Sequence, residues 1–284
     1  MPTDLMTAAA FNIVLLAALV HAGWNAIVKG SCDKLLTTVL ITLSAAGASA
    51  LALPFLPPPA PAPAAWHFLL ASAVLQTGYF LLVAATYRLA DLSQAYPLMR
   101  GTAPLIVSLA SVLVLGERLA LPAWAGIGLI SAGILGLALA APVRGGPGTL
   151  LALATALVIA GYTLVDGTGV RHSGAPVAYV LWLNLLTGVP FALWLLVRRP
   201  PAFGPYLRRN WGFGLVGGLG TLLSYGLALW AMTGTPVAAV AALRETSILF
   251  GVAISALVLN EKVSPRRILA ALLVLAGAAL IRLA

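Results

Sequence analysis

Arginine stands near the start of two long apolar segments of this sequence. Residues 96–118 read YPLMRGTAPLIVSLASVLVLGER and residues 240–262 read VAALRETSILFGVAISALVLNEK, which puts the cations at Arg100 and Arg244. A charge within hydrocarbon costs about 2.5–3.5 kcal/mol on insertion scales, so such side chains face a partner, a bundle interior or a water-filled cavity. The chemistry that they offer is binding of a carboxylate or formation of a breakable ion pair. The candidate ion-pair partners, which are also candidates for binding a coupling proton, are Glu245 and Asp166.

The depth of the two arginines leaves two interpretations open. Each precedes a glutamate at the end of its segment by 17 residues, which is about 25 Å of helix. In a hydrocarbon core of about 30 Å, each arginine then lies about 5–10 Å from one membrane face, where a long side chain can reach the headgroups. A cavity or gate role is favoured by the helical faces, which combine the cations with small and polar residues. These faces are Arg100, Pro104, Val107 and Ser111, and Arg244, Ile248, Gly251 and Ser255.

Hinges and surface ion pairs are expected at defined positions of the same segments. Pro104 removes a backbone hydrogen bond inside its helix and is a hinge candidate, and Gly251 is the candidate in the second segment, which has no proline. The closing glutamates, Glu117 and Glu261, each stand beside a cation. We expect them to form structural or gating ion pairs at the membrane surface.

Further polar and aromatic side chains could line a pocket with the arginines. His21 and Asn25 are four residues apart and share a helix face, beside Trp24. The aromatic residues have a second interpretation as interface belts. No metal or cofactor is expected, because Cys32 is the single cysteine and the glycine-rich stretch 212–220 lacks the lysine and serine of a phosphate-binding loop. The other pocket candidates are Gln76, Tyr79, Tyr96, Tyr162, Ser224 and Tyr225.

The composition identifies the chain as an integral membrane protein. Hydrophobic residues make up 61% of the 284 residues and charged residues 8%, whereas soluble domains carry about 25% charged residues. A spanning helix needs about 20 apolar residues, and ten such blocks fill nearly the whole sequence. The predicted helices cover residues 5–28, 35–56, 66–88, 92–115, 120–141, 148–169, 176–197, 211–233, 236–259 and 265–283.

An internal repeat organises these helices. When the sequence is shifted by 144 residues, Arg100 falls on Arg244 and Glu117 on Glu261. Because five helices per copy is an odd number, the second copy must enter the membrane in the opposite orientation. We therefore predict an all-α polytopic membrane protein with ten transmembrane helices in two inverted five-helix repeats around a central cavity. The two repeats cover residues 1–143 and 147–284.

The basic residues predict the orientation. The formal net charge is +9, but the lysines and arginines are scattered over short loops and not gathered with stacking aromatics, so nucleic acid is not an expected partner. They concentrate in the loops after the odd-numbered helices. The positive-inside rule puts these loops in the cytoplasm and both termini outside.

Several of these stretches resemble the ten-helix EamA-type branch of the drug/metabolite transporter superfamily. The resemblance rests on AGWNA at 22–26, YPLMRGTAPLIV with LGERL in the fourth helix and LNEKV after the ninth. It implies a basket-like bundle that works by alternating access, often in export of amino acids or related metabolites. It also implies a central cavity formed largely by helices 1, 3, 4, 6, 8 and 9.

Together these features predict a transporter and not an enzyme. We expect a monomeric secondary-active exporter or exchanger of a small polar metabolite, such as an amino acid with an aromatic side chain, in a bacterial-type inner membrane. Protons are the candidate coupling ion. The alternative is a lipid or lipid-linked-sugar flippase, which would need a pocket continuous with the bilayer, whereas a membrane enzyme would need a clustered nucleophile and base.

Overall fold

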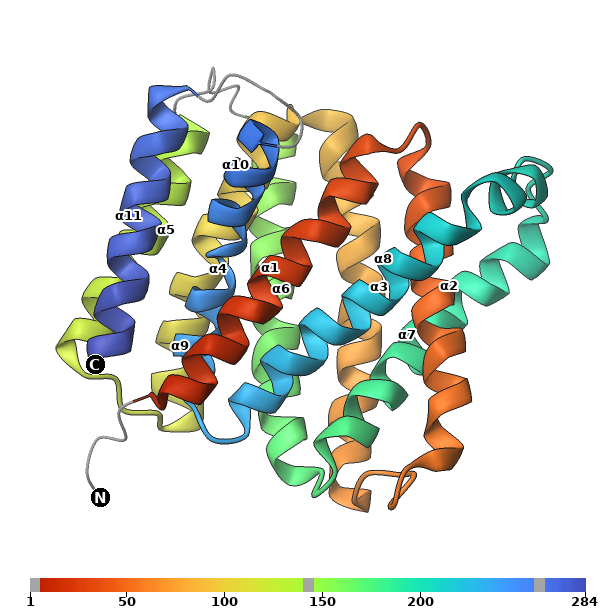
Figure 1. Cartoon of the computed structure of the whole chain (residues 1–284), viewed down its shortest axis with the longest axis horizontal. Helices are drawn as coiled ribbons and strands as arrows, with labels where there is room; N and C mark the ends of the chain where they lie inside the picture. The colour runs from red at the N-terminus through yellow and green to blue at the C-terminus, as the bar shows by residue number, and fades with distance from the viewer. Residues whose placement is uncertain (1–5, 140–145, 258–263) are drawn as a thin grey trace.

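The computed structural model describes residues 6–139, 146–257 and 264–284, with the side chains at 27–30, 84, 92, 255 and 257 also outside the description. Helices make up nearly all of this part of the chain and pack as one bundle (Figure 1). Two short 3-10 turns, Leu53–Phe55 and Pro63–Ala65, lie between α2 and α3. The α-helices are α1 Ala8–Gly30, α2 Lys34–Ala52, α3 Trp66–Leu89, α4 Leu92–Leu115, α5 Leu121–Leu139, α6 Pro147–His172, α7 Pro176–Arg198, α8 Phe203–Met232, α9 Val237–Arg244, α10 Ser247–Leu257 and α11 Pro265–Leu283.

The helices have the length and apolarity of membrane spans. Within the described ranges, nine helical stretches can cross a membrane, the last being α9 and α10 taken together as Val237–Ile254. The remaining helix, α11, has 19 residues and carries arginines at its two ends, Arg266, Arg267 and Arg282. The prediction of an all-α polytopic membrane protein with ten spans is confirmed.

The ninth predicted helix, 236–259, is not continuous. It ends as α9 at Arg244 and resumes as α10 at Ser247, with Glu245 and Thr246 in a turn between them. Across this turn the Glu245 and Thr246 N–H groups donate to the carbonyls three residues earlier, those of Ala242 and Leu243, at 3.0 Å each, which is the tighter 3-10 pattern and interrupts the α-helical one. Irregular backbone at membrane depth is tolerated where protein or a cavity surrounds it, so this break marks an interior site.

Helix α8 is also longer than predicted. It begins at Phe203 and not at 211, because Arg208 and Arg209 are good helix formers that extend it into water rather than ending it. Gly204 and Pro205 lie in its first turn, where a proline costs no hydrogen bond. The other predicted ends differ from the observed ones by a few residues, as is usual for helix ends.

Helices α5 and α11 pack at a two-fold axis between the halves. A Cβ added to Gly126 would lie 2.6 Å from the Gly277 carbonyl oxygen, and one added to Gly133 would lie 3.0 Å from that of Ala270. The 144-residue shift exchanges these two contacts, since it maps Gly126 onto Ala270 and Gly133 onto Gly277. The contacts of α3 with α6 and of α1 with α8 are related in the same way. Because α1 and α6 run in opposite directions (Figure 1), the two five-helix repeats are inverted.

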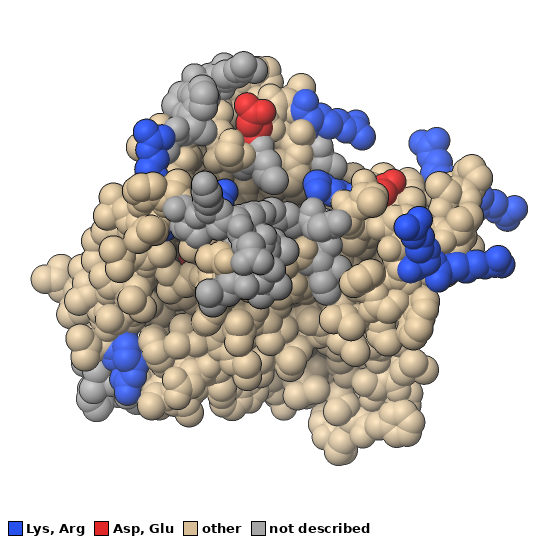
Figure 2. All heavy atoms as spheres, turned by 45° about the horizontal axis from the view of Figure 1, so that its top comes forward, with Lys and Arg blue, Asp and Glu red and all other residues tan. Residues whose placement is uncertain are grey.

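The two ends of the bundle differ in charge. One end, the termini face, holds the start of α1 and the end of α11, whereas the opposite end, the basic face, holds the α1–α2, α3–α4 and α7–α8 turns (Figure 1). Figure 2, in which the basic face comes forward, shows lysine and arginine side chains gathered there. The exposed basic residues near this face are Lys34, Arg88, Arg198, Arg199, Arg208, Arg209, Arg266 and Arg267.

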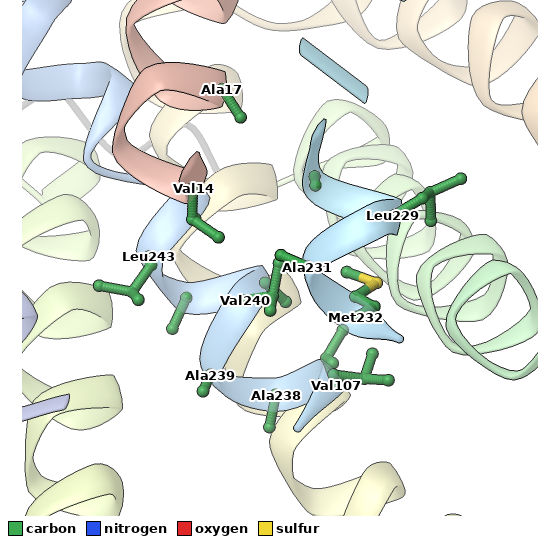
Figure 3. Close-up of a cluster of buried hydrophobic side chains, with 14 of the residues drawn as sticks. Val14, Ala17, Val107, Leu229, Ala231, Met232, Ala238, Ala239, Val240 and Leu243 are labelled. Carbon is green, nitrogen blue, oxygen red and sulfur yellow. The ribbon is translucent and has the colours of Figure 1, made fainter. Parts of the chain in front are cut away.

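The core lies where helices of both halves meet. Figure 3 shows Val14 of α1, Val107 of α4 and Leu229 of α8 around Val240 and Leu243 of α9. Every residue from Val237 to Leu243 is buried, so α9 lies inside the bundle and not against lipid. Its carboxyl end carries Arg244 and the turn that contains Glu245 into the centre.

Candidate functional site

Arg100 and Glu245 form a buried ion pair between the two halves. The Arg100 Nε and Glu245 Oε2 atoms are 2.9 Å apart, and the side chains are 9% and 6% exposed. Arg100 therefore does not extend to the headgroups, which was one of its two interpretations from the sequence. Glu245 was a candidate partner, and the turn between α9 and α10 brings it to the arginine of α4.

This ion pair leaves hydrogen-bonding atoms without partners. Within the described part of the chain, the buried Arg100 Nε and Nη2 and Glu245 Oε2 atoms have no aligned hydrogen bond. An unsatisfied buried polar group costs about 1–3 kcal/mol, and more when it is charged. The guanidinium therefore retains donor capacity for a water molecule or for the carboxylate of a ligand.

A small cavity adjoins the ion pair. The room for the centre of a water molecule is about 10 Å³, which suffices for about one water. A site for a small-molecule ligand needs about 300 Å³ or more, so this cavity as it stands is too small to hold one. It is lined by Arg100, Ala103, Pro104, Val107, Ile159, Tyr162, Thr163, Ala241, Arg244 and Glu245.

Arg244 is held differently from its counterpart Arg100. Its guanidinium carbon lies 4.9 Å from the centre of the Tyr225 ring, a cation–π contact. The Tyr225 ring meets Tyr162 edge-on at 6.3 Å, and Tyr162 meets Tyr79 in the same way at 5.9 Å. Three of the predicted pocket aromatics thus form a row that starts at Arg244.

Asp166 lies at the other end of Tyr225. It is fully buried, and its carboxylate accepts hydrogen bonds from the Tyr225 hydroxyl at 2.5 Å, the Tyr179 hydroxyl at 3.0 Å and Gln76 Nε2 at 3.2 Å. These partners are neutral, so Asp166 belongs to a polar cluster and not to an arginine pair. Tyr225 connects this cluster to Arg244, because its hydroxyl donates to the Asp166 carboxylate and the face of its ring contacts the Arg244 guanidinium.

The predicted residues of α1 contact one another but use their polar atoms differently. His21 and Trp24 meet edge-on at 5.1 Å, and Asn25 Nδ2 donates to the His21 carbonyl at 2.8 Å, so this amide is occupied within its own helix. The Trp24 Nε1 atom is buried without a hydrogen-bond partner in the described structure. It is therefore a donor for a ligand or for water.

Other predicted residues contribute less directly. The Ser224 hydroxyl donates to the Thr221 carbonyl of its own helix at 3.2 Å. Tyr96 packs against a second buried cluster that includes Met99 and Ala103.

Of the two hinge candidates, Pro104 lines the cavity, whereas a Cβ added to Gly251 would meet nothing within 4 Å. Glu261 and the side chain of Ser255 lie outside the described residues.

Glu117 joins three elements at the termini face. Its Oε1 atom is 2.9 Å from Arg171 Nη2 of α6 and accepts from the Val237 N–H at 2.8 Å, so it binds the amino end of α9. Arg171 also donates to the carbonyls of Met232 and Thr235 at 2.8 and 2.9 Å. We call this cluster the α9 latch.

Sequence reasoning missed two of these residues. Arg171 was not expected because Arg118 is adjacent to Glu117, and Tyr179 was missed because its contact with Asp166 depends on how α7 packs on α6. An arginine close to the end of an apolar helix was the available signal for the first. Within the described ranges no group of three or more His, Cys, Asp or Glu that could hold a metal comes together.

Comparisons with known proteins identify the chain. A solved structure described as "Crystal structure of protein" superposes with a TM-score of 0.72 over 97% of this chain and 96% of its own, at 21% identity, a likeness that shows the fold alone. A search of curated proteins finds no significant match. The sequence matches the profile of the EamA-like transporter family twice, over residues 9–139 and 146–283. The chain therefore belongs to the EamA-like transporter family, within the drug/metabolite transporter superfamily, and is a multi-pass membrane transporter and not an enzyme.

Proposed function

We propose that this protein is a secondary-active exporter or exchanger of a small metabolite that carries a carboxylate, such as an amino acid with an aromatic side chain. The observation that carries the proposal is the buried Arg100–Glu245 pair, whose guanidinium has unpartnered donors beside a cavity. A substrate carboxylate competes with Glu245 for Arg100, because a planar guanidinium binds carboxylates through paired hydrogen bonds. The row of Tyr225, Tyr162 and Tyr79 offers apolar faces to the side chain.

The charges at the centre support proton coupling through Asp166. Arg100 and Arg244 carry two positive charges, and Glu245 and Asp166 carry two negative charges when both are ionised. Protonation of Asp166 leaves an excess of one positive charge, which favours binding of a carboxylate. The proton and the carboxylate then move in the same direction, so this coupling fits exchange of one substrate molecule for another, and export only down the substrate's own gradient. Tyr225 transmits the change, because its hydroxyl binds Asp166 and its ring carries Arg244.

Alternating access requires that the bundle opens at one end at a time. The α9 latch ties α4, α6 and α9 at the termini face, so we propose that the latch closes this face and must break before the cavity opens there. Pro104 remains the proposed hinge of α4, and the break at Glu245 gives the second half its flexible point. The basic face is cytoplasmic by the positive-inside rule, in a bacterial-type inner membrane, and the protein acts as a monomer.

The proposed substrate class is testable by counterflow in proteoliposomes. Vesicles loaded with one unlabelled amino acid are tested for uptake of the same labelled compound, over aromatic, aliphatic and polar amino acids. Each amino acid is paired with the amine that lacks its carboxylate. Charge-assisted hydrogen bonds contribute about 1.5–3 kcal/mol, so we expect the amine to exchange at least about tenfold more weakly. Equal exchange of acid and amine, or no saturable exchange of any amino acid, would refute the carboxylate assignment, and scrambling of a labelled phospholipid would favour the flippase.

A further inference from the structure

A second and larger cavity opens at the basic face. It is a groove of about 800 Å³ between the end of α1, the start of α2 and the first turns of α8, which is within the size range of about 300–1,000 Å³ for ligand sites. It shares no lining residue with the cavity at Arg100. It is therefore distinct from the small cavity at the ion pair. Its lining is Ala26, Ser31, Cys32, Asp33, Leu36, Thr37, Leu40, Ala202, Pro205, Tyr206, Arg209, Asn210, Phe213 and Gly214.

The walls of this groove change from polar to apolar along the membrane normal. Asp33, Arg209 and Asn210 contribute polar groups toward the basic face, whereas Leu40 and Phe213 lie further along α2 and α8 toward the hydrocarbon. Leu40 is seven residues beyond Asp33, or about 10 Å deeper at 1.5 Å per residue. A charged mouth beside the exposed apolar side chain of Phe213 matches a molecule that has a polar head and a hydrocarbon chain.

Hydrogen bonds hold the mouth of the groove in shape. The Tyr206 hydroxyl of α8 meets the Thr37 hydroxyl of α2 at 2.5 Å, which joins the two walls. The Asp33 carboxylate accepts from the Leu36 N–H at 2.9 Å as the cap of α2. The single acid in the lining is therefore already engaged with the start of a helix.

The charge around the mouth is strongly positive. Four exposed arginines flank the α7–α8 turn, and no acidic residue occurs between 198 and 214. Figure 2 shows basic side chains projecting where this turn lies. Trp211 and Phe213 are 63% and 62% exposed beside them, as is common for residues at the headgroup level. The four arginines are Arg198, Arg199, Arg208 and Arg209.

We propose that this groove binds an anionic phospholipid of the leaflet at the basic face. Arg209 binds the phosphate, the neighbouring arginines raise the local concentration of anionic lipid, and an acyl chain lies along the exposed side chain of Phe213. Basic pockets between membrane helices suit such headgroups, and each basic residue near the surface contributes about 1 kcal/mol of attraction. Because the site is separate from Arg100, the proposal does not depend on the transported substrate.

The protein carries its own probe of this site. Cys32 is the single cysteine of the chain, is exposed and lines the groove. We suggest measuring its alkylation by uncharged N-ethylmaleimide in nanodiscs of phosphatidylcholine alone and of phosphatidylcholine with phosphatidylglycerol. A groove that is about two-thirds occupied would slow alkylation about threefold by mass action. We expect this slowing in the wild type when phosphatidylglycerol is present.

Two matched variants separate the site from general surface charge. Arg209→Gln removes the arginine that lines the groove, whereas Arg208→Gln removes the same charge from a neighbour that does not line it. We expect the lipid effect to vanish in Arg209→Gln and to persist in Arg208→Gln, with equal alkylation of both variants in phosphatidylcholine as the check on folding. Equal slowing in both variants, no slowing in the wild type, or equal protection by both lipids would overturn the proposal.

Discussion

The two arginines that the repeat places at equivalent positions have different environments. Arg100 forms an ion pair with Glu245, whereas Arg244 lies on the ring of Tyr225. The residue after Arg100 is Gly101, and the residue after Arg244 is Glu245. A Cβ at Gly101 would lie 2.8 Å from Leu135 Cγ, so a glutamate does not fit there without rearrangement. The inverted halves therefore share their helices but place one carboxylate, not two, between the two arginines.

As a result, the charge of Arg100 is neutralised by a carboxylate, whereas the charge of Arg244 is not. Glu245 balances one of the two arginines, and the second is stabilised by an aromatic face that carries no net charge. The helices differ in the same sense, because α4 runs unbroken past Arg100 whereas α9 ends at Arg244. We infer that the first half supplies the binding cation and the second half supplies the group that is released from it.

The largest expected effect comes from removing Arg100. Arg100→Ala leaves the Glu245 carboxylate buried without its counter-ion, which costs about 3–5 kcal/mol of stability, and we expect transport of an identified substrate to fall about 100-fold, since each tenfold corresponds to about 1.4 kcal/mol. Thermal unfolding followed by tryptophan fluorescence measures the first effect and counterflow the second. If an unpaired carboxylate is the cause, the double variant Arg100→Ala/Glu245→Ala unfolds at a higher temperature than the single variant. A double variant less stable than the single one would contradict this account.

A second test addresses Asp166. Its hydrogen-bond partners are neutral side chains, whereas the partner of Glu245 is the cation Arg100. Asp166→Asn preserves the side-chain shape but cannot release a proton, so we expect uptake driven by a pH gradient to fall at least about tenfold while counterflow changes less than about threefold. Tyr225→Phe keeps the ring under Arg244 and removes the hydroxyl, so its effect should lie between those of Asp166→Asn and the wild type. Proton-driven uptake that survives in Asp166→Asn would exclude this carboxylate as the coupling site.

Removal of Arg244 should have a smaller effect than removal of Arg100. Arg244→Gln loses a cation–π contact that contributes about 0.5–2 kcal/mol, and it leaves no buried carboxylate unpaired. The unfolding temperature is therefore expected to fall less than in Arg100→Gln, with counterflow reduced about tenfold. Equal destabilisation by the two substitutions would mean that the two halves are electrostatically alike after all.

The smallest expected effect concerns the α9 latch. The Glu117–Arg171 pair includes a side chain that is 30% exposed, so Glu117→Gln should weaken the closure by about 1 kcal/mol, or about fivefold in the population of the open state. The readout is alkylation of a cysteine at buried Thr235, in the Thr235→Cys/Cys32→Ser background. Arg282→Gln is the matched control, because Arg282 donates to the Met6 carbonyl at the same face and not to the latch. An equal rise in both variants would show that the face loosens generally and that the latch has no specific role.

Part of the candidate site was predictable because it depends on local pattern. Arg100 and Arg244 attract attention as charges in apolar segments, and the 144-residue repeat pairs them without any structure. The pairing of Arg100 with Glu245 was one of several open choices, because helical spacing tells which residues share a face but not which face meets which helix. The break after Arg244 was hidden for a similar reason, since Glu245 and Thr246 sit in a stretch that is apolar enough for a continuous span.

The sequence by itself determined the membrane environment, the ten spans and the inverted repeat. Hydropathy is a property of each short segment, and the odd number of helices per repeat follows from the duplication. Both can be derived from the sequence without knowing which helices contact one another. Only the tertiary structure decided that Arg171 and not Arg118 pairs with Glu117, that Tyr179 reaches Asp166, and that a groove lies between α2 and α8. These features arise from packing between helices distant in the chain, where the low dielectric of the interior makes the choice of partner for each charge decisive.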